Sequence, residues 1–160
     1  MSILIDGHNL IGQLKDLSLA DPDDEAKLVQ RLKVYRNVAN QPITVIFDSG
    51  ATYTPPHNFS GGGVKVVFAG VNSSADRHII SRIEHSANPH SLLVVSSDHA
   101  IQAVARSRGA RVLTSQEFAR KMVQTHAPKH KRRKRVPRER ALSASEVDEW
   151  LAIFQDRPKE

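Results

Sequence analysis

Cysteine is absent from the 160-residue sequence, aromatic residues make up only 5% of it, and tryptophan occurs once. Without cysteine the chain can form no disulfide, no thiolate metal site and no thiol nucleophile, which is compatible with a reducing compartment. A long hydrophobic run is also missing. The apolar stretch Met1–Ile5 has no basic leader and is far too short for a signal peptide or a membrane span. We therefore expect a cytoplasmic protein without a membrane-spanning segment.

Positive charge is concentrated in one segment. The formal net charge is +6, yet residues 1–125 hold 13 Lys/Arg against 11 Asp/Glu, whereas residues 129–140 hold 8 Lys/Arg and one Glu. A basic run suits a polyanionic partner, because each neutralised phosphate releases condensed counterions. The plain alternative is a solvated linker. The candidates for polyanion contact are Lys129, Lys131, Arg132, Arg133, Lys134 and Arg135.

Five short apolar runs, rich in β-branched residues, alternate with helical patterns. The runs are almost continuously hydrophobic, as expected when helices cover both faces of a parallel sheet. We therefore expect an α/β fold, a Rossmann-like three-layer sandwich built on a five-stranded parallel sheet. The expected strands are Ser2–Ile5, Ile43–Phe47, Val64–Ala69, Ser91–Val95 and Arg111–Thr114.

End signals mark the expected helices. Asp21 can cap a helix whose first position is Pro22, and the apolar residues between 28 and 39 recur at helical spacing. Further helices are expected from near Ser74, from about His99 to Arg108 with Gly109 as the stop, and from near Ser115.

Two segments break this rhythm. Ser49–Gly63 contains two prolines and three consecutive glycines, so we expect a long loop, and such loops are often functional. Ser143–Glu146 is a capping box that opens a short helix carrying Trp150, which can dock on the domain or on a partner. We divide the chain into an α/β domain (1–125), a basic linker (126–142) and a C-terminal helix (143–156).

Four aspartates follow successive strands of the expected sheet. Asp6 ends the first strand and Asp48 the second, while Asp76 and Asp98 follow the third and fourth. A single aspartate at such a place is usually a cap or a turn former. Four carboxylates at one edge repel each other unless a cation lies between them. Oxygen ligands without cysteine favour Mg²⁺ or Mn²⁺ over zinc, and such an ion can polarise a phosphodiester and activate water.

The blocks that carry these aspartates resemble a known family. Ile3–Gly12, Val45–Asp48, Ser74–Asp76 and Val94–Asp98 occur in the order and at the spacing of the YacP-like NYN domains, which belong to the PIN-like nuclease superfamily. The resemblance covers residues 1 to about 125. It implies a PIN-like fold and a metal-dependent endoribonuclease whose hydrolysis leaves a 5′-phosphate.

The resemblance also implies roles for individual residues. Asp6, Asp76 and Asp98 match the metal-binding aspartates of the family. Asn9 matches an asparagine that orients the first aspartate or the phosphate, and Asp48 matches a further acidic position.

The sequence departs from the family pattern at two places. His8 stands where the family often has tyrosine. The acidic residue that PIN-type proteins carry on the first helix has no unambiguous counterpart. Asp24 or Glu25 could serve, but helix capping explains both more simply.

Our leading interpretation is an endoribonuclease in which metal-activated water attacks RNA, with mRNA on the ribosome as one candidate substrate. The loop Ser49–Gly63 and the run Lys129–Arg140 would hold the RNA backbone. Arg77, next to Asp76, can reach a phosphate, although an exposed charged face explains it more simply.

Two other functions agree with parts of the sequence. A non-catalytic RNA- or ribosome-binding module with the same fold gains nothing from repelling aspartates that face phosphate. A phosphatase of the haloacid-dehalogenase type needs a second acid two residues after the first aspartate, and His8 occupies that place. Both are less favoured than the nuclease.

Overall fold

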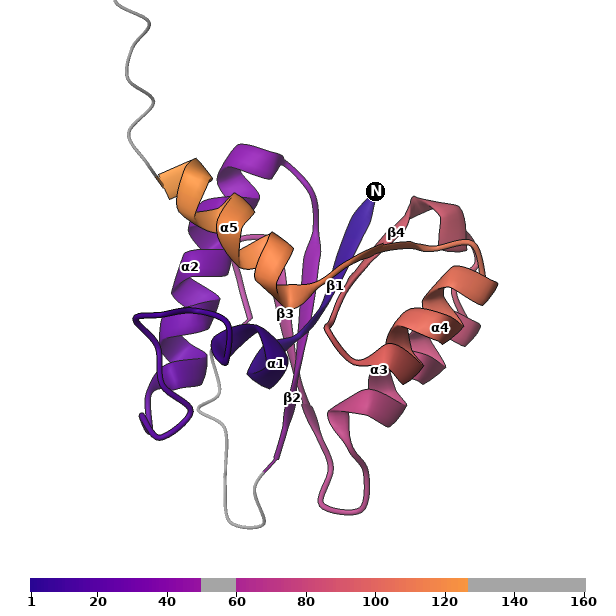
Figure 1. Ribbon diagram of the computed structural model, residues 1–160, viewed down its shortest axis with the longest axis horizontal. Coiled ribbons are helices and arrows are strands. Elements are labelled where there is room, and N and C mark those ends of the chain that lie inside the picture. Colours follow the sequence, from indigo (N-terminus) through magenta and orange to yellow (C-terminus); the bar gives the residue numbers. More distant parts are fainter. Residues whose placement is uncertain (50–59, 127–160) are drawn as a thin grey trace, which may run out of the picture. The chain divides into compact units, whose positions relative to one another are not determined.

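The computed structural model describes residues 1–49 and 60–126. Within them, five strands form one parallel sheet in the order β3-β2-β1-β4-β5 (Figure 1). The expected α/β fold is confirmed, and each strand end agrees with the expectation to within one residue. The strands are β1 (Ser2–Asp6), β2 (Ile43–Asp48), β3 (Val64–Ala69), β4 (Leu92–Val95) and β5 (Arg111–Leu113).

Helices cover both faces of the sheet (Figure 1). One face carries α1 (Gly7–Ile11), α2 (Asp24–Ala39) and α5 (Ser115–His126), and the other carries α3 (Ala75–Glu84) and α4 (His99–Ser107). A 3₁₀ turn, η1 (Pro89–Ser91), precedes β4. Successive residues of β1 enter opposite cores: Ile3 and Ile5 pack under α1, α2 and α5, while Leu4 packs under α3 and α4. Burial on both faces explains why the strands are continuously hydrophobic.

The short helix α1 was not expected from the sequence. It begins directly after β1, and the carboxylate of Asp6 accepts a hydrogen bond from the backbone N–H of Asn9 in its first turn. Gly7 brings the helix close to β2, because a Cβ atom there would lie 2.2 Å from the ring of Phe47. Alanine at this position would therefore push β2 and α1 apart.

The start of α2 differs from the expectation. The helix begins at Asp24 with Asp23 as its N-cap residue, so Pro22 lies before the helix and not at its first position. Asp21 accepts a hydrogen bond from the N–H of Asp23 at 2.9 Å and pairs with Lys27. It therefore forms a turn ahead of the helix, which leaves Asp24 and Glu25 in the first helical turn.

The other expected helix ends are confirmed. Ser74 caps α3 through the N–H of Arg77, and Gly109 follows α4 with a φ angle of +79°, which favours glycine. No described helix is long and apolar enough to cross a membrane. The basic run, the C-terminal helix expected at 143–156 and most of the loop Ser49–Gly63 lie outside the described residues.

Candidate active site at the carboxyl edge of the sheet

The aspartates gather where the sheet changes its direction of growth. The chain adds β2 and β3 on one side of β1 and then β4 and β5 on the other, and ligands of open α/β sheets bind at such switch points. Asp6 and Asp48 end β1 and β2, Asp98 follows β4, and Asp76 lies in the first turn of α3. The charges of Asp48 and Asp76 act on Asp6, and those of Asp48 and Asp98 act on Asp76. We call these four residues the acidic edge.

Asp6 is the buried member of the acidic edge, with only 7% of its surface exposed. Its Oδ1 accepts the N–H of Asn9 at 3.3 Å and its Oδ2 accepts the hydroxyl of Ser96 at 3.4 Å, so both hydrogen bonds are long. Burial raises the pKa of Asp6 to about 6; the charges of Asp76 and Asp48 add to the increase, and the two hydrogen bonds oppose it. The fold thus desolvates this carboxylate and compensates it weakly.

Asp48 anchors α3 to the end of β2. Its Oδ1 accepts the N–H of Ala75 at 2.7 Å, which fixes the first turn of α3 and therefore the place of Asp76. Desolvation raises the pKa of Asp76, and the charges of Asp98 and Asp48 raise it further. Asp48 is consequently an electrostatic neighbour of the site and also a residue that positions another member of it.

Ser96 links the ends of β1 and β4. It is fully buried, and its hydroxyl donates to Asp6 and accepts the N–H of Asp98 at 3.1 Å. Asp98 is the N-cap of α4, because its Oδ1 accepts the N–H groups of Ala100 at 2.8 Å and Ile101 at 3.1 Å. One oxygen of Asp98 therefore caps α4, while the negative charge of Asp98 acts on Asp76.

A buried glutamine that the sequence analysis did not single out supports Ser96. The amide of Gln102 on α4 donates to the carbonyl of Ser96 at 2.7 Å, and Arg106 donates to the Gln102 carbonyl at 3.2 Å. Gln102 is only 5% exposed, and the signal in the sequence was its place in the apolar helix stripe beside Ile101 and Ala105. It holds the loop after β4 against α4.

Asn9 ties three segments together. Its backbone N–H donates to Asp6, while its side-chain oxygen accepts the N–H of Ser97 at 3.1 Å and the hydroxyl of Ser115 at 2.6 Å. Ser97 in turn accepts the N–H of Ser115 at 3.1 Å. Asn9 therefore connects α1 to the loop after β4 and to the start of α5, which agrees with an orienting role.

His8 and Glu25 extend the site toward α2. His8 Nε2 lies 3.1 Å from Glu25 Oε1, and Nδ1 lies 3.4 Å from the N–H of Asp48. The His8 ring also contacts Phe47 edge to face. Glu25 is buried and pairs with His8, so capping is not its main role. Only the tertiary fold brings His8 and Glu25 together, and their spacing of 17 residues carried no signal.

The donor set fits a divalent cation that keeps part of its water shell. Among residues 1–49 and 60–126, no three Asp, Glu or His side chains are close enough together to ligate one ion. Asp6, Asp76 and Asp98 therefore do not form a complete three-ligand set in this part of the chain, and their role as metal ligands stays a prediction. No described Lys or Arg forms an ion pair with the acidic edge. Magnesium commonly uses one or two carboxylates and several waters, which suits these residues.

Arg77 lies beside the acidic edge in the first turn of α3. Its side chain is exposed, and its backbone N–H donates to Ser74. The expected phosphate contact of Arg77 therefore stays a prediction. The basic candidates between Lys129 and Arg135 lie outside the described residues.

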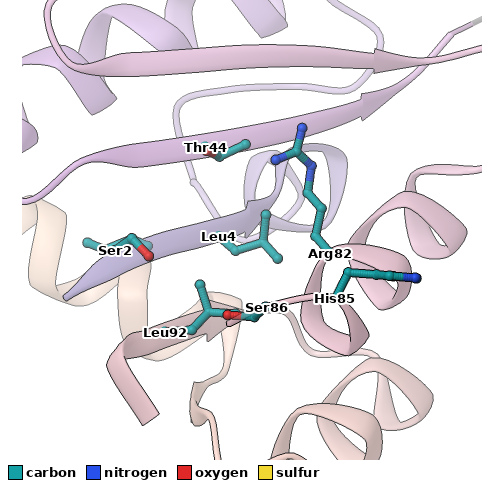
Figure 2. Close-up of a pocket in the computed structure, with 8 residues that line it drawn as sticks. Ser2, Leu4, Thr44, Arg82, His85, Ser86 and Leu92 are labelled. Carbon is teal, nitrogen blue, oxygen red and sulfur yellow. The ribbon is translucent and has the colours of Figure 1, made fainter. Parts of the chain in front are cut away.

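A cavity of about 300 Å³ lies at the opposite end of the sheet, where the strands begin (Figure 2). Ser2 and Leu92, the first residues of β1 and β4, line it together with Thr44, the second residue of β2. Arg82 extends over the cavity from the end of α3. This cavity contains none of the predicted site residues.

Comparison with known proteins identifies the family of the chain. A model of the YacP-like NYN domain family matches residues 3–155. The chain belongs to this family. NYN domains are PIN-like nucleases, which supports an RNA nuclease. No curated protein matches the chain.

Solved structures agree with the fold. The crystal structure of Rae1 (YacP) from Bacillus subtilis is similar, with a TM-score of 0.68 and 22% identity over 78% of this chain and 75% of that chain. A tryptophan-to-leucine variant of Rae1 gives a TM-score of 0.61 and 27% identity over 78% of this chain and 77% of that chain. The YacP-like NYN fold expected from the sequence is thus confirmed.

Proposed function

We propose that this YacP-like NYN protein is a metal-dependent endoribonuclease that hydrolyses RNA phosphodiester bonds at the acidic edge. The observation that carries the proposal is the environment of Asp6. Its carboxylate is buried beside Asp48 and Asp76, and no described lysine or arginine pairs with these residues. Such an arrangement destabilises the ionised protein unless a cation binds, and sites with raised pKa values of this kind are often functional.

Asp6, Asp76 and Asp98 are the residues that would hold Mg²⁺ or Mn²⁺, in part through water. When bound, such an ion polarises the phosphodiester and lowers the pKa of a coordinated water. The protein's own residues supply the positioning. Asn9 orients the carboxylate of Asp6 through its backbone, and Asp48 fixes the turn that carries Asp76.

RNA contacts would come from cationic groups around the acidic edge. Arg77 directly follows Asp76 in the sequence, and its exposed guanidinium can bind a phosphate. We assign the same role to Lys129–Arg135 on the strength of their charge. The carboxylates themselves repel phosphate, so a cation and basic side chains are needed together. A non-catalytic binding module would need only the basic groups.

The proposal is tested with purified protein and labelled RNA in Mg²⁺, in Mn²⁺ and in EDTA. We expect cleavage only with metal. Asp6→Asn, Asp76→Asn and Asp98→Asn should lower the cleavage rate on the order of 10²–10³-fold while RNA binding persists, since each removes charge without changing side-chain size. Glu84→Gln, which makes the same charge change on an exposed carboxylate at the far end of α3 from Asp76, is the matched control.

Two results would contradict the nuclease. Cleavage that continues in EDTA would exclude metal dependence. Binding of RNA without any cleavage, by a folded protein in either metal, would favour the non-catalytic alternative.

A further inference from the structure

A groove runs along α5 on the face of the sheet that also carries α1 and α2. Its cavity volume is about 810 Å³. One wall is the exposed side of α5 from Gln116 to Gln124, and the other is formed by residues 12–16 after α1 together with Arg31 of α2. We call it the α5 groove. None of its lining residues was assigned a role above.

The α5 groove carries a net positive charge. Four charged side chains line it: Lys15, Asp16, Arg31 and Arg120. Arg31 pairs with Asp16, donating from Nη1 to Oδ1 at 2.9 Å, so these two charges neutralise each other and brace the wall. Lys15 and Arg120 have no hydrogen-bond or ion-pair partner among residues 1–49 and 60–126, and both are exposed. The charge of Arg120 also acts on Glu117 of the same helix, and together with Lys15 it leaves two cations that can contact an anionic partner.

The remaining lining suits nucleobases. Gln13, Gln116 and Gln124 present exposed amides, each of which can both donate and accept hydrogen bonds. Val123 adds an apolar surface that is 63% exposed. Single-stranded RNA offers unpaired base edges to amides and its phosphates to cations, whereas a duplex would present mainly its backbone and 2′-hydroxyls.

The α5 groove begins one residue away from the hydrogen bonds that support the acidic edge. Gln116 directly follows Ser115, whose hydroxyl bonds Asn9, and Asn9 donates its backbone N–H to Asp6. The eight helical steps from Gln116 to Gln124 extend about 12 Å away from that point. The end of the groove at Gln116 is therefore the end nearer to the acidic edge. The smaller cavity in Figure 2 has no such link, because it lies where the strands begin.

We infer that the α5 groove binds single-stranded RNA next to the scissile phosphate, with Lys15 and Arg120 on the backbone and the glutamines on the bases. The inference rests on the proposed function for its substrate and adds a binding path to it. It also accounts for an exposed valine on a helix whose other face is buried.

Charge reversal with matched controls tests the α5 groove. Lys15→Glu and Arg120→Glu are compared with Lys65→Glu and Lys121→Glu, which make the same charge change on exposed residues outside the groove. Binding of a short labelled oligouridylate is measured in EDTA, so that cleavage does not interfere. Each groove variant should weaken binding about three- to tenfold and flatten the salt dependence by about 0.7 per lost phosphate contact, while the controls change little.

The outcomes separate this inference from the nuclease proposal. Equal effects of groove and control variants would show that only net charge matters and would overturn the groove, even if the protein cuts RNA. Selective loss of binding in the groove variants would support the groove, even if the acidic edge proves inactive.

A thiol probe locates the RNA directly, because the chain has no cysteine of its own. Val123→Cys carries a photocrosslinker in the groove, and Ala87→Cys carries it at an exposed position near the end of α3. We expect RNA to crosslink at position 123 and not at 87. A crosslink from position 123 to another part of this chain, or to a protein partner, in place of RNA would overturn the inference.

Discussion

The ends of β1 and β4 are neighbours at one edge of the sheet, yet the aspartates that follow them differ in burial and in hydrogen bonding. Asp6, at the end of β1, is buried and receives two long hydrogen bonds, so its pKa rises to about 6. Asp98, after β4, is partly exposed and receives two backbone hydrogen bonds as the cap of α4. The fold gains stability from Asp98 and loses it by ionising Asp6. A carboxylate that destabilises its own fold indicates a requirement outside folding.

The largest expected effect is the pH dependence of stability that Asp6 causes. Its pKa is about 6 in the folded protein against 3.8 ordinarily, so the folded state binds more protons between these values. The free energy of unfolding should therefore fall as pH rises through this window, by up to about 3 kcal/mol, and then level off. The measurement is urea unfolding of metal-free protein at several pH values.

Asp6→Asn supplies the reference curve, because Asn carries no titrating proton. Asp16, Asp21 and Glu117 have pKa values lowered by their hydrogen bonds, and Asp76 has a raised pKa. These groups titrate in both proteins, so their contributions cancel in the difference between the two curves. A difference curve that is flat from pH 4 to 7 would mean that Asp6 is not desolvated as described.

A smaller effect should come from the cap of α4. Asp98→Ala removes the acceptor for the N–H groups of Ala100 and Ile101, so we expect a loss of about 1 kcal/mol in unfolding free energy. Asp98→Asn keeps a capping oxygen and should retain nearly the full stability while losing RNA cleavage. If both variants were equally destabilised, charge and not capping would explain the contribution of Asp98.

The smallest effect should come from Ser96, which forms hydrogen bonds with both Asp6 and Asp98. Ser96→Ala removes the hydroxyl that lowers the pKa of Asp6, so that pKa should rise above about 6. The same change leaves the N–H of Asp98 without its hydroxyl acceptor. Carboxyl NMR of metal-free protein reports the pKa directly, and an unchanged value would remove Ser96 from the link between β1 and β4.

Much of this arrangement could be predicted from the sequence. The five strands are continuous apolar runs that end at polar residues, so their bounds were predicted to within a residue, and the parallel sheet brought Asp6, Asp48, Asp76 and Asp98 to one edge. An aspartate at the end of a parallel strand can be assigned to the carboxyl edge of the sheet without knowledge of side-chain packing. This part of the site follows from local pattern and topology.

What the sequence did not show depends on packing between distant segments. The five residues of α1 are too few for a helical period, and the close approach of Gly7 to Phe47 appears only in three dimensions. The pairing of His8 with Glu25 joins two helices, and Gln102 reaches Ser96 because α4 packs back on the sheet. Likewise, the order of strands did not show that one carboxylate oxygen of Asp98 accepts the capping hydrogen bonds of α4.

The most direct test of a cation at the acidic edge is the anomalous diffraction of a crystal soaked in Mn²⁺. We expect one or two peaks next to the carboxylate of Asp6, with Asp76 and Asp98 as further direct or water-mediated ligands. An Mn²⁺ peak elsewhere, or none near Asp6 in a crystal of protein that cuts RNA, would contradict the proposed role of the acidic edge.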